Sequence, residues 1–137
     1  KQDLGGSGSI VVFSQTYEKQ ILNQLAQQFP EDEIWVELTK ERIVDLLIPF
    51  RNFSYYNPKQ KGSASLKKVL PAITGKDYSH LNIADGELAY ITFLDTIQGN
   101  LTQDKIKELR QEMLAYCKLD TEGMVWIVEE LRKLLDQ

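Results

Sequence analysis

The chain has 137 residues, a mass of 15.8 kDa and a formal net charge of −4 at neutral pH. Hydrophobic residues make up 42% and charged residues 26%, values that exclude a disordered chain, and no apolar run reaches the roughly 18 residues needed to span a membrane. The single cysteine, Cys117, excludes an internal disulfide framework and favours a reducing compartment, so we expect a cytoplasmic protein in which Cys117 packs in the core. The chain begins at Lys1 rather than at a methionine, and we expect a piece of a longer protein.

Residues 1–9 are rich in glycine and serine and predict a flexible tail or linker. Residues 10–13 form a continuously apolar, β-branched run, which predicts a strand buried on both faces. Ser14 or Thr16 then caps a helix that Pro30 stops. A strand followed closely by a helix is typical of an α/β layer.

Residues 34–36 predict a second short extended segment, and a helix is expected over residues 39–50. Residues 51–64 have no helical period and contain asparagine, proline and glycine, so they are expected to form a loop. Ser63 or Ser65 begins the next short amphipathic helix.

The pattern of the remaining residues, from Asp85 onward, predicts helices. Asp85 caps a helix that ends at Gly99-Asn100, Thr102 caps a longer one, and a last helix is expected from about Asp120. The resulting fold class is α/β, with one or two strands and about five helices in a single domain over residues 10–137.

Two polar patterns suggest chemistry. Tyr116 precedes Asp120 by four residues, which places both side chains on one face of a helix, where the carboxylate can bind a hard cation such as Mg²⁺ or Mn²⁺. Glu18 stands in the first turn of a helix directly after a strand, where sites in α/β sheets gather. The alternative interpretation is structural: Glu18 is a solvated first-turn acid, Tyr116 covers the core, and Asp120 is the N-cap of the last helix.

Taken in their order along the chain, the segments IVVFSQTYEKQIL and YCKLD resemble the second and third motifs of ribonuclease-H-like three-prime-to-five-prime exonucleases of the DEDDy, DnaQ-like type. Over the whole chain the resemblance is to a narrower group, bacterial proteins with a domain of unknown function that often follows a RecB-like nuclease region. It is carried by GSIVVFSQTYEKQIL, DLLIPFRNFSYYNPKQKGSASLKKVLPAI and LAYCKLDTEGMVWIVEELRKLL. The resemblance implies a ribonuclease-H-like fold and two-metal phosphodiester hydrolysis.

The resemblance also implies site residues. Glu18 corresponds to the acid of the second motif, where the superfamily usually has aspartate. Tyr116 corresponds to the tyrosine that orients water, and Asp120 to the last metal-binding acid. The remaining acid corresponds to Asp85 or to Asp45, with a slight preference for Asp85.

The first motif of these exonucleases, a D-x-E on the first strand, has no counterpart before residue 14, where only Asp3 is present. We therefore expect Mg²⁺ or Mn²⁺ to bind in the parent protein and not in this fragment, which should be inactive or nearly so. The expected partners are nucleic acid and the N-terminal remainder of the parent, with no membrane.

Residues 51–76 carry six cations and no acid, so the rest of the chain carries a charge of −10. Lysines that contact phosphates and aromatic rings that stack on bases suit a single-stranded DNA or RNA substrate. The residues expected to bind nucleic acid are Arg51, Tyr55, Tyr56, Lys59, Lys61, Lys67 and Lys68. The alternatives are a solvated loop whose aromatics cover the edge of the core, and a non-catalytic module that binds nucleic acid or protein on a ribonuclease-H-like scaffold.

Overall fold

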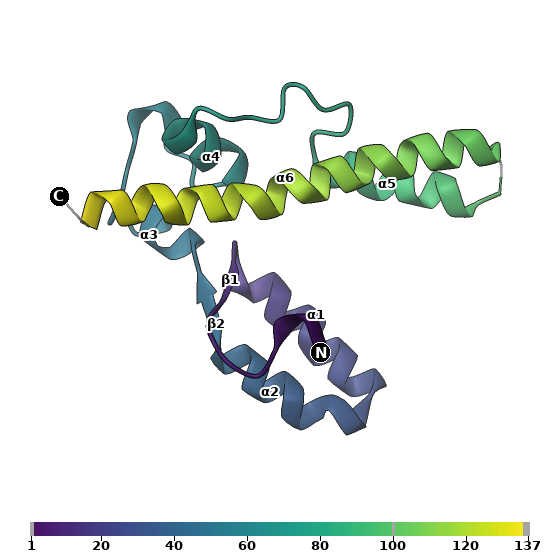
Figure 1. Cartoon of the computed structure of the whole chain (residues 1–137), viewed down its shortest axis with the longest axis horizontal. Helices are drawn as coiled ribbons and strands as arrows, with labels where there is room; N and C mark the ends of the chain where they lie inside the picture. Colours follow the sequence, from purple (N-terminus) through teal and green to yellow (C-terminus); the bar gives the residue numbers. More distant parts are fainter. Residues whose placement is uncertain (1, 100, 136–137) are drawn as a thin grey trace. The chain divides into compact units, whose positions relative to one another are not determined.

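The computed structural model describes residues 2–99 and 101–135. The chain divides into two compact units, Lys1–Leu66 and Lys67–Gln137, and each is described by itself. The described residues contain a two-stranded parallel sheet and six α-helices (Figure 1), which confirms the mixed α/β class predicted from the sequence. The single domain expected over residues 10–137 stays a prediction.

The first unit contains the sheet. Strand β1 (Ile10–Val12) runs parallel to β2 (Ile43–Asp45), with Val11 opposite Val44. Val12 is buried, whereas Val11 and Val44 are exposed. The expectation of burial on both faces was wrong, because successive side chains of a strand alternate between faces and one face of this small sheet is open.

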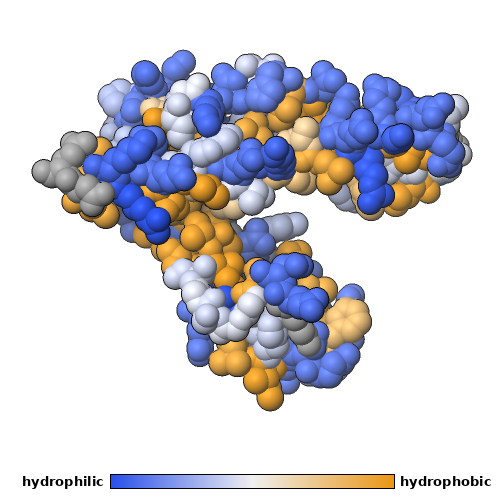
Figure 2. All heavy atoms as spheres, viewed as in Figure 1, coloured by the Kyte–Doolittle hydropathy of each residue, from blue (hydrophilic) through white to orange (hydrophobic). Residues whose placement is uncertain are grey.

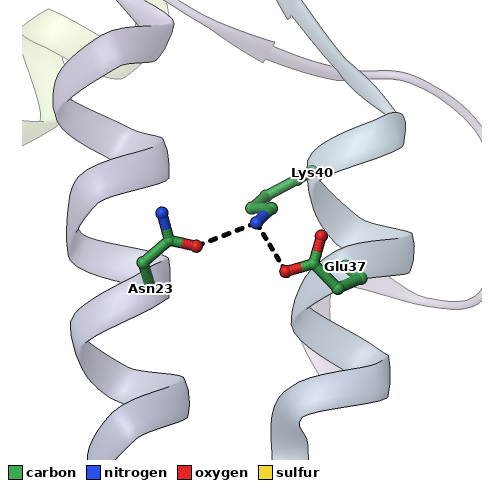
Figure 3. Close-up of polar contacts among 3 residues, drawn as sticks. All are labelled: Asn23, Glu37 and Lys40. Atoms are coloured by element: carbon green, nitrogen blue, oxygen red, sulfur yellow. Dashed lines mark hydrogen bonds and ion pairs between the residues drawn. The ribbon is translucent and has the colours of Figure 1, made fainter.

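A helical hairpin connects the two strands. It consists of α1 (Gln15–Gln28), the short 3-10 turn η2 (Pro30–Asp32) and α2 (Glu33–Glu41), and the two helices lie side by side (Figure 1). The Lys40 ammonium joins them, because it lies 2.8 Å from Asn23 Oδ1 on α1 and 2.6 Å from Glu37 Oε1 on its own helix (Figure 3).

Residues 34–36 belong to α2 and are not extended as predicted. Val36 and Thr39, three positions apart, are the buried residues of this helix, so the apolar run supplies one helical face. The helix expected over residues 39–50 was also wrong, because α2 ends at Glu41 and strand β2 intervenes before α3 (Leu47–Arg51).

Asp45, at the end of β2, organises the neighbouring chain ends. Its carboxylate accepts three backbone N–H bonds, from Ser14 at 2.9 Å, Gln15 at 3.0 Å and Leu47 at 2.9 Å. These donors open α1 and α3, whose first N–H groups have no partner within the helix. Ser14 is the N-cap residue of α1 as predicted, but its own side chain makes no cap hydrogen bond.

Arg42 holds the segment that precedes β1. Its guanidinium donates four hydrogen bonds of 2.7–3.0 Å to backbone carbonyls, those of Leu4, Gly5, Ser7 and Gly8. The carbonyl of Arg42 in turn accepts the N–H of Ile10 at 2.9 Å. One residue therefore ties the glycine-rich segment to the edge of the sheet.

The second unit is helical, with α4 (Leu66–Thr74), α5 (Gly86–Ile97) and α6 (Gln103–Leu135), and α5 packs along α6 (Figure 1). Val69 and Leu70 of α4 and Ile127 of α6 are completely buried. A Cβ atom at Gly123 would lie 3.0 Å from Leu70 Cδ2, so the missing side chain lets α6 approach α4 closely.

Asp85 caps α5, as predicted, by accepting the Leu88 N–H at 2.8 Å. The separate last helix expected from Asp120 was wrong, because α6 is continuous from Gln103 to Leu135 and Asp120 lies inside it rather than at an N-cap. Cys117 is exposed on this helix and not in the core. Asn100, part of the predicted break, lies outside the described residues.

Within residues 2–99 and 101–135, no helix combines the length and apolar character needed to cross a membrane.

Candidate functional site

The first candidate surface is the aromatic loop, defined here as residues 51–64. Its fold is set by Gln60, whose buried side chain accepts the Asn57 N–H at 2.9 Å and donates to the Ser63 carbonyl at 3.2 Å. The Asn57 side chain accepts the Lys59 N–H at 3.0 Å, which completes a capping box around the turn η3 (Pro58–Gln60). The loop is therefore built around an internal set of polar contacts.

Two aromatic rings are displayed on this loop. Phe53 has a φ of 55° and is 67% exposed, and Tyr56 is 43% exposed, with the two ring centroids 5.6 Å apart. The Tyr56 hydroxyl accepts the Gly62 N–H at 3.2 Å. Beside them opens a cavity of about 150 Å³, to whose lining Arg51, Phe53 and Tyr56 all contribute. The loop thus offers exposed rings next to a guanidinium.

Tyr55 has a different position from Tyr56. Its ring meets Phe50 edge-on with centroids 5.8 Å apart, and its N–H donates to the Pro49 carbonyl at 3.1 Å. Phe50 is itself stacked on Phe13 at 6.3 Å. Tyr55 therefore covers the edge of the core, which is the structural alternative foreseen for the aromatics.

The predicted cations fall in both units. Arg51 ends α3, and Lys59 and Lys61 are exposed on the aromatic loop. Lys67 and Lys68 are exposed in the first turn of α4, which belongs to the second unit.

The second candidate is a polar cluster between α6 and the loop that follows α4. The buried Tyr78 donates its hydroxyl to Asp120 Oδ1 at 2.6 Å, and its ring lies 6.1 Å from that of Tyr116. Burial of the Tyr78 hydroxyl, with this hydrogen bond and the carboxylate charge, raises the pKa of Tyr78 well above its usual value.

Tyr116 interacts electrostatically with two carboxylates of the second unit. Burial of its hydroxyl, then the charge of Asp120 and more weakly that of Asp85, raise the pKa of Tyr116 to about 12. A Cβ at Gly86, beside Asp85, would be 3.8 Å from the Tyr116 hydroxyl oxygen. The structure thus brings together Tyr116, Asp120 and Asp85, three of the residues predicted for a catalytic metal site.

Glu18 is exposed in the first turn of α1, in the first unit, whereas Asp120 belongs to the second. The predicted convergence of these two carboxylates stays a prediction. Asp45, the other candidate acid, is committed to the three N–H groups described above, which lower its pKa against the opposing effect of burial.

In the described part of the chain, no three His, Cys, Asp or Glu side chains form a group that could hold a metal ion. Asp85 and Asp120 supply two carboxylates, and a hydroxyl already occupies one oxygen of Asp120. These residues alone do not fit a site for two divalent ions, which needs several oxygen ligands for each ion.

Sequence reasoning missed two residues. Phe53 was not distinguished from its aromatic neighbours, because a left-handed φ at a phenylalanine has no sequence signal. Tyr78 stands 42 positions before Asp120, and only the fold brings the two together.

The sequence of residues 1–65 matches the family model of a domain of unknown function (DUF2779). The matched segment ends next to the division between the two units at Leu66. No curated protein matches the chain, and no solved structure does. The chain is therefore similar to that domain over its first unit.

Proposed function

We propose that this chain binds single-stranded nucleic acid through the aromatic loop, as the non-catalytic part of a cytoplasmic nuclease-like protein. The observation that carries the proposal is Phe53, a bulky side chain held at a φ of 55° and yet 67% exposed. Non-glycine residues at positive φ are strained, and such strain is concentrated at functional positions. At Phe53 the strained backbone holds a ring that is mostly exposed to solvent rather than packed in the core.

The neighbours of Phe53 suit an unpaired nucleic-acid strand. Tyr56 adds a second exposed ring, Arg51 lines the same cavity as both rings, and Lys59 and Lys61 are exposed cations of the same loop. Exposed rings stack on unpaired bases, and the surrounding cations contact the phosphates. Tyr55 already covers the core edge, so that role does not require Phe53 or Tyr56.

The test separates binding from stability at Phe53. Replacing Phe53→Gly removes the ring and relieves the strain, so the chain should become more stable by about 1 kcal/mol. The same change should weaken binding of a fluorescent single-stranded oligonucleotide about fivefold to a hundredfold, the loss expected for one stacked base. Phe53→Trp should retain binding, and Tyr17→Ala, at an exposed ring on α1, is the matched control.

The role of the loop lysines is tested with the same fluorescent oligonucleotide, whose binding is followed by fluorescence anisotropy. Lys59→Ala with Lys61→Ala should flatten the dependence of log K on log salt by about 1.4, the value for two phosphate contacts on a single strand. Lys105→Ala with Lys107→Ala on α6 controls for net charge. Unchanged affinity in Phe53→Gly together with an unchanged salt slope would refute the interface.

A second function rests on Tyr116, Asp85 and Asp120. In the parent protein these residues would contribute to metal-dependent phosphodiester hydrolysis, with the remaining ligands supplied from outside this set. The chain alone should release no nucleotides from a single-stranded oligonucleotide in the presence of Mg²⁺ or Mn²⁺. If the chain does hydrolyse the oligonucleotide and Asp120→Asn abolishes that activity, the residues of this chain are sufficient to complete the site.

A further inference from the structure

The cavity beside Phe53 and Tyr56 brings exposed rings together with polar groups. Exposed hydrophobic residues also occur on other elements, as Figure 2 shows where α5 and α6 pair. Exposure of the rings alone therefore does not decide which ligand fits this cavity. The free hydrogen-bonding groups of its lining do.

The free polar side chains of this cavity are donors. Arg51 is exposed, and in the part of the chain that the structure describes its guanidinium makes no hydrogen bond or ion pair, so its N–H donors are available. Its charge acts on Asp45, but that carboxylate is bonded to backbone N–H groups. The Tyr56 hydroxyl oxygen accepts the Gly62 N–H, which leaves the hydroxyl hydrogen to donate.

The other polar side chains of the lining are already bonded within the loop. Gln60 Oε1 accepts the Asn57 N–H, and Gln60 Nε2 donates to the Ser63 carbonyl. The Ser63 hydroxyl donates to Ser65 Oγ at 3.2 Å and accepts the Ser65 N–H at 3.3 Å. Residues 51–64 contain no acid. A ligand that fits this cavity therefore presents hydrogen-bond acceptors to the free donors.

The size and shape of the cavity favour a single planar ring system. Its volume is about 150 Å³, and a cavity of that size can hold a benzene-sized ring. The planes of the Phe53 and Tyr56 rings are inclined at 49°, so a flat ligand stacks on one ring and meets the other obliquely. The Arg51 guanidinium is a planar fork that pairs best with two acceptors side by side. The fitting ligand is therefore a base with two adjacent acceptors.

Guanine is the base that meets both conditions best. It presents O6 and N7 side by side, and arginine donating to these two atoms is the commonest specific contact of proteins with a base. Cytosine also has two adjacent acceptors, O2 and N3, but offers a smaller face for stacking on the exposed rings. Adenine, thymine and uracil place a donor beside each acceptor that the fork could reach.

We infer that the cavity of the aromatic loop binds a guanine base of a single strand, with Arg51 donating to O6 and N7 and the exposed Phe53 ring stacked on its face. This inference rests on the proposed function and deepens it by naming the base. Arg51 sets the choice of base, whereas Lys59 and Lys61 contact phosphates, which are the same in every sequence.

The test uses the full chain and short labelled oligonucleotides that are abasic at every position except the central one, so that a single base varies on a constant backbone. In fluorescence anisotropy the guanine strand should bind about fivefold or more tightly than the adenine strand, which carries a purine of similar stacking area. Arg51→Lys keeps the charge and loses the fork, so it should abolish this difference. Arg110→Lys, at an exposed residue of α6, is the matched control and should retain it.

A change in the base keeps the test valid if Arg51→Lys misfolds. A strand with 7-deazaguanine, in which C–H replaces N7, should lose the advantage of guanine when it binds the unchanged chain. Equal binding of the guanine and adenine strands, tighter binding of the cytosine strand, or a preference that persists in Arg51→Lys would overturn the guanine assignment and leave the proposed function standing. A chain that binds no single-stranded oligonucleotide at all would refute the proposed function together with this site.

Discussion

The Tyr78 hydroxyl donates to Asp120 Oδ1 at 2.6 Å, and this bond links the loop after α4 to the middle of α6. The acceptor is a half-buried carboxylate and the donor is a buried phenol, so the hydrogen bond is charge-assisted and shielded from water. Burial of the Tyr116 hydroxyl is the largest cause of its raised pKa, and the charge of the Asp120 carboxylate is the second. Both phenols therefore keep their protons to a higher pH in the folded chain than in the unfolded chain.

Stability of the second unit should consequently fall in alkaline solution. Tyrosine in an unfolded chain loses its proton near pH 10, whereas the pKa of Tyr116 in the folded chain is about 12 and that of Tyr78 is also raised. The contribution is thus fully present below pH 10 and is lost as the pH rises through the folded values. Urea unfolding followed by circular dichroism should show a falling free energy of unfolding above pH 10.

Tyr78→Phe tests the assignment. The variant should lose about 1.5–3 kcal/mol at neutral pH, the net contribution of a hydrogen bond to a charged group, and its stability should fall less steeply above pH 10. Tyr17→Phe, at an exposed ring in the first unit, is the control. An alkaline profile as steep in Tyr78→Phe and Tyr116→Phe as in the unchanged chain would contradict the role of these two hydroxyls.

Asp45→Ala should destabilise the first unit by about 2–4 kcal/mol, because it removes the acceptor of three N–H groups at two helix starts. Asp45→Asn retains one acceptor oxygen and should cost less. Hydrogen exchange at the first amides of α1 and α3 is the local measurement, and Asp95→Ala, at an exposed residue of α5 in the second unit, is the control.

The sign of the pH effect at Asp45 is opposite to that at the tyrosines. Backbone N–H bonds and the nearby Arg51 lower its pKa in the folded chain, although burial, the largest single effect, opposes them. Its contribution to stability is present above the unfolded value near pH 4 and is lost as the pH falls through the lowered folded value. Asp45→Asn should therefore show a weaker loss of stability below pH 4 than the unchanged chain.

Gly123→Ala should destabilise the second unit, although alanine is favoured over glycine in a helix by about 1 kcal/mol. The added methyl would meet Leu70 Cδ2 at 3.0 Å and Cδ1 at 3.3 Å, and Leu70 is completely buried. Overpacking of this kind typically costs about 1–3 kcal/mol. In a Leu70→Ala background the same change should become stabilising, and a thermal-unfolding cycle that shows no such reversal would exclude the clash.

Local chemistry made part of the fold predictable. The β-branched run at Ile10–Val12 and the Asp85 cap of α5 each act over a few residues, and both predictions were confirmed. The strand Ile43–Asp45 was not predicted, because it forms by pairing with β1, more than thirty positions earlier in the sequence. Its residues also suit a helical face when only their near neighbours are considered.

The continuity of α6 was missed for a different reason. Asp120-Thr121 looks like a cap, but α6 continues through both residues. Asp120 accepts from Tyr78 in the loop after α4, and the Thr121 hydroxyl donates to the Cys117 carbonyl of its own helix at 3.0 Å. The pairing of Tyr116 with Asp120 follows from helical spacing, whereas the contribution of Asp85 depends on how α5 returns along α6. The candidate site was therefore predictable within one helix and not between helices.

The parallel register of β1 and β2 has a kinetic consequence for the first unit. Ile10 cannot reach Ile43 until the intervening chain has closed a long loop, which costs entropy before any strand contact repays it. The hairpin of α1 and α2 reduces this entropy cost, because its local contacts form first and bring the chain that becomes β2 back toward β1. We expect the strands to join late, so substitutions in the sheet should mainly accelerate unfolding and those in the hairpin should slow folding.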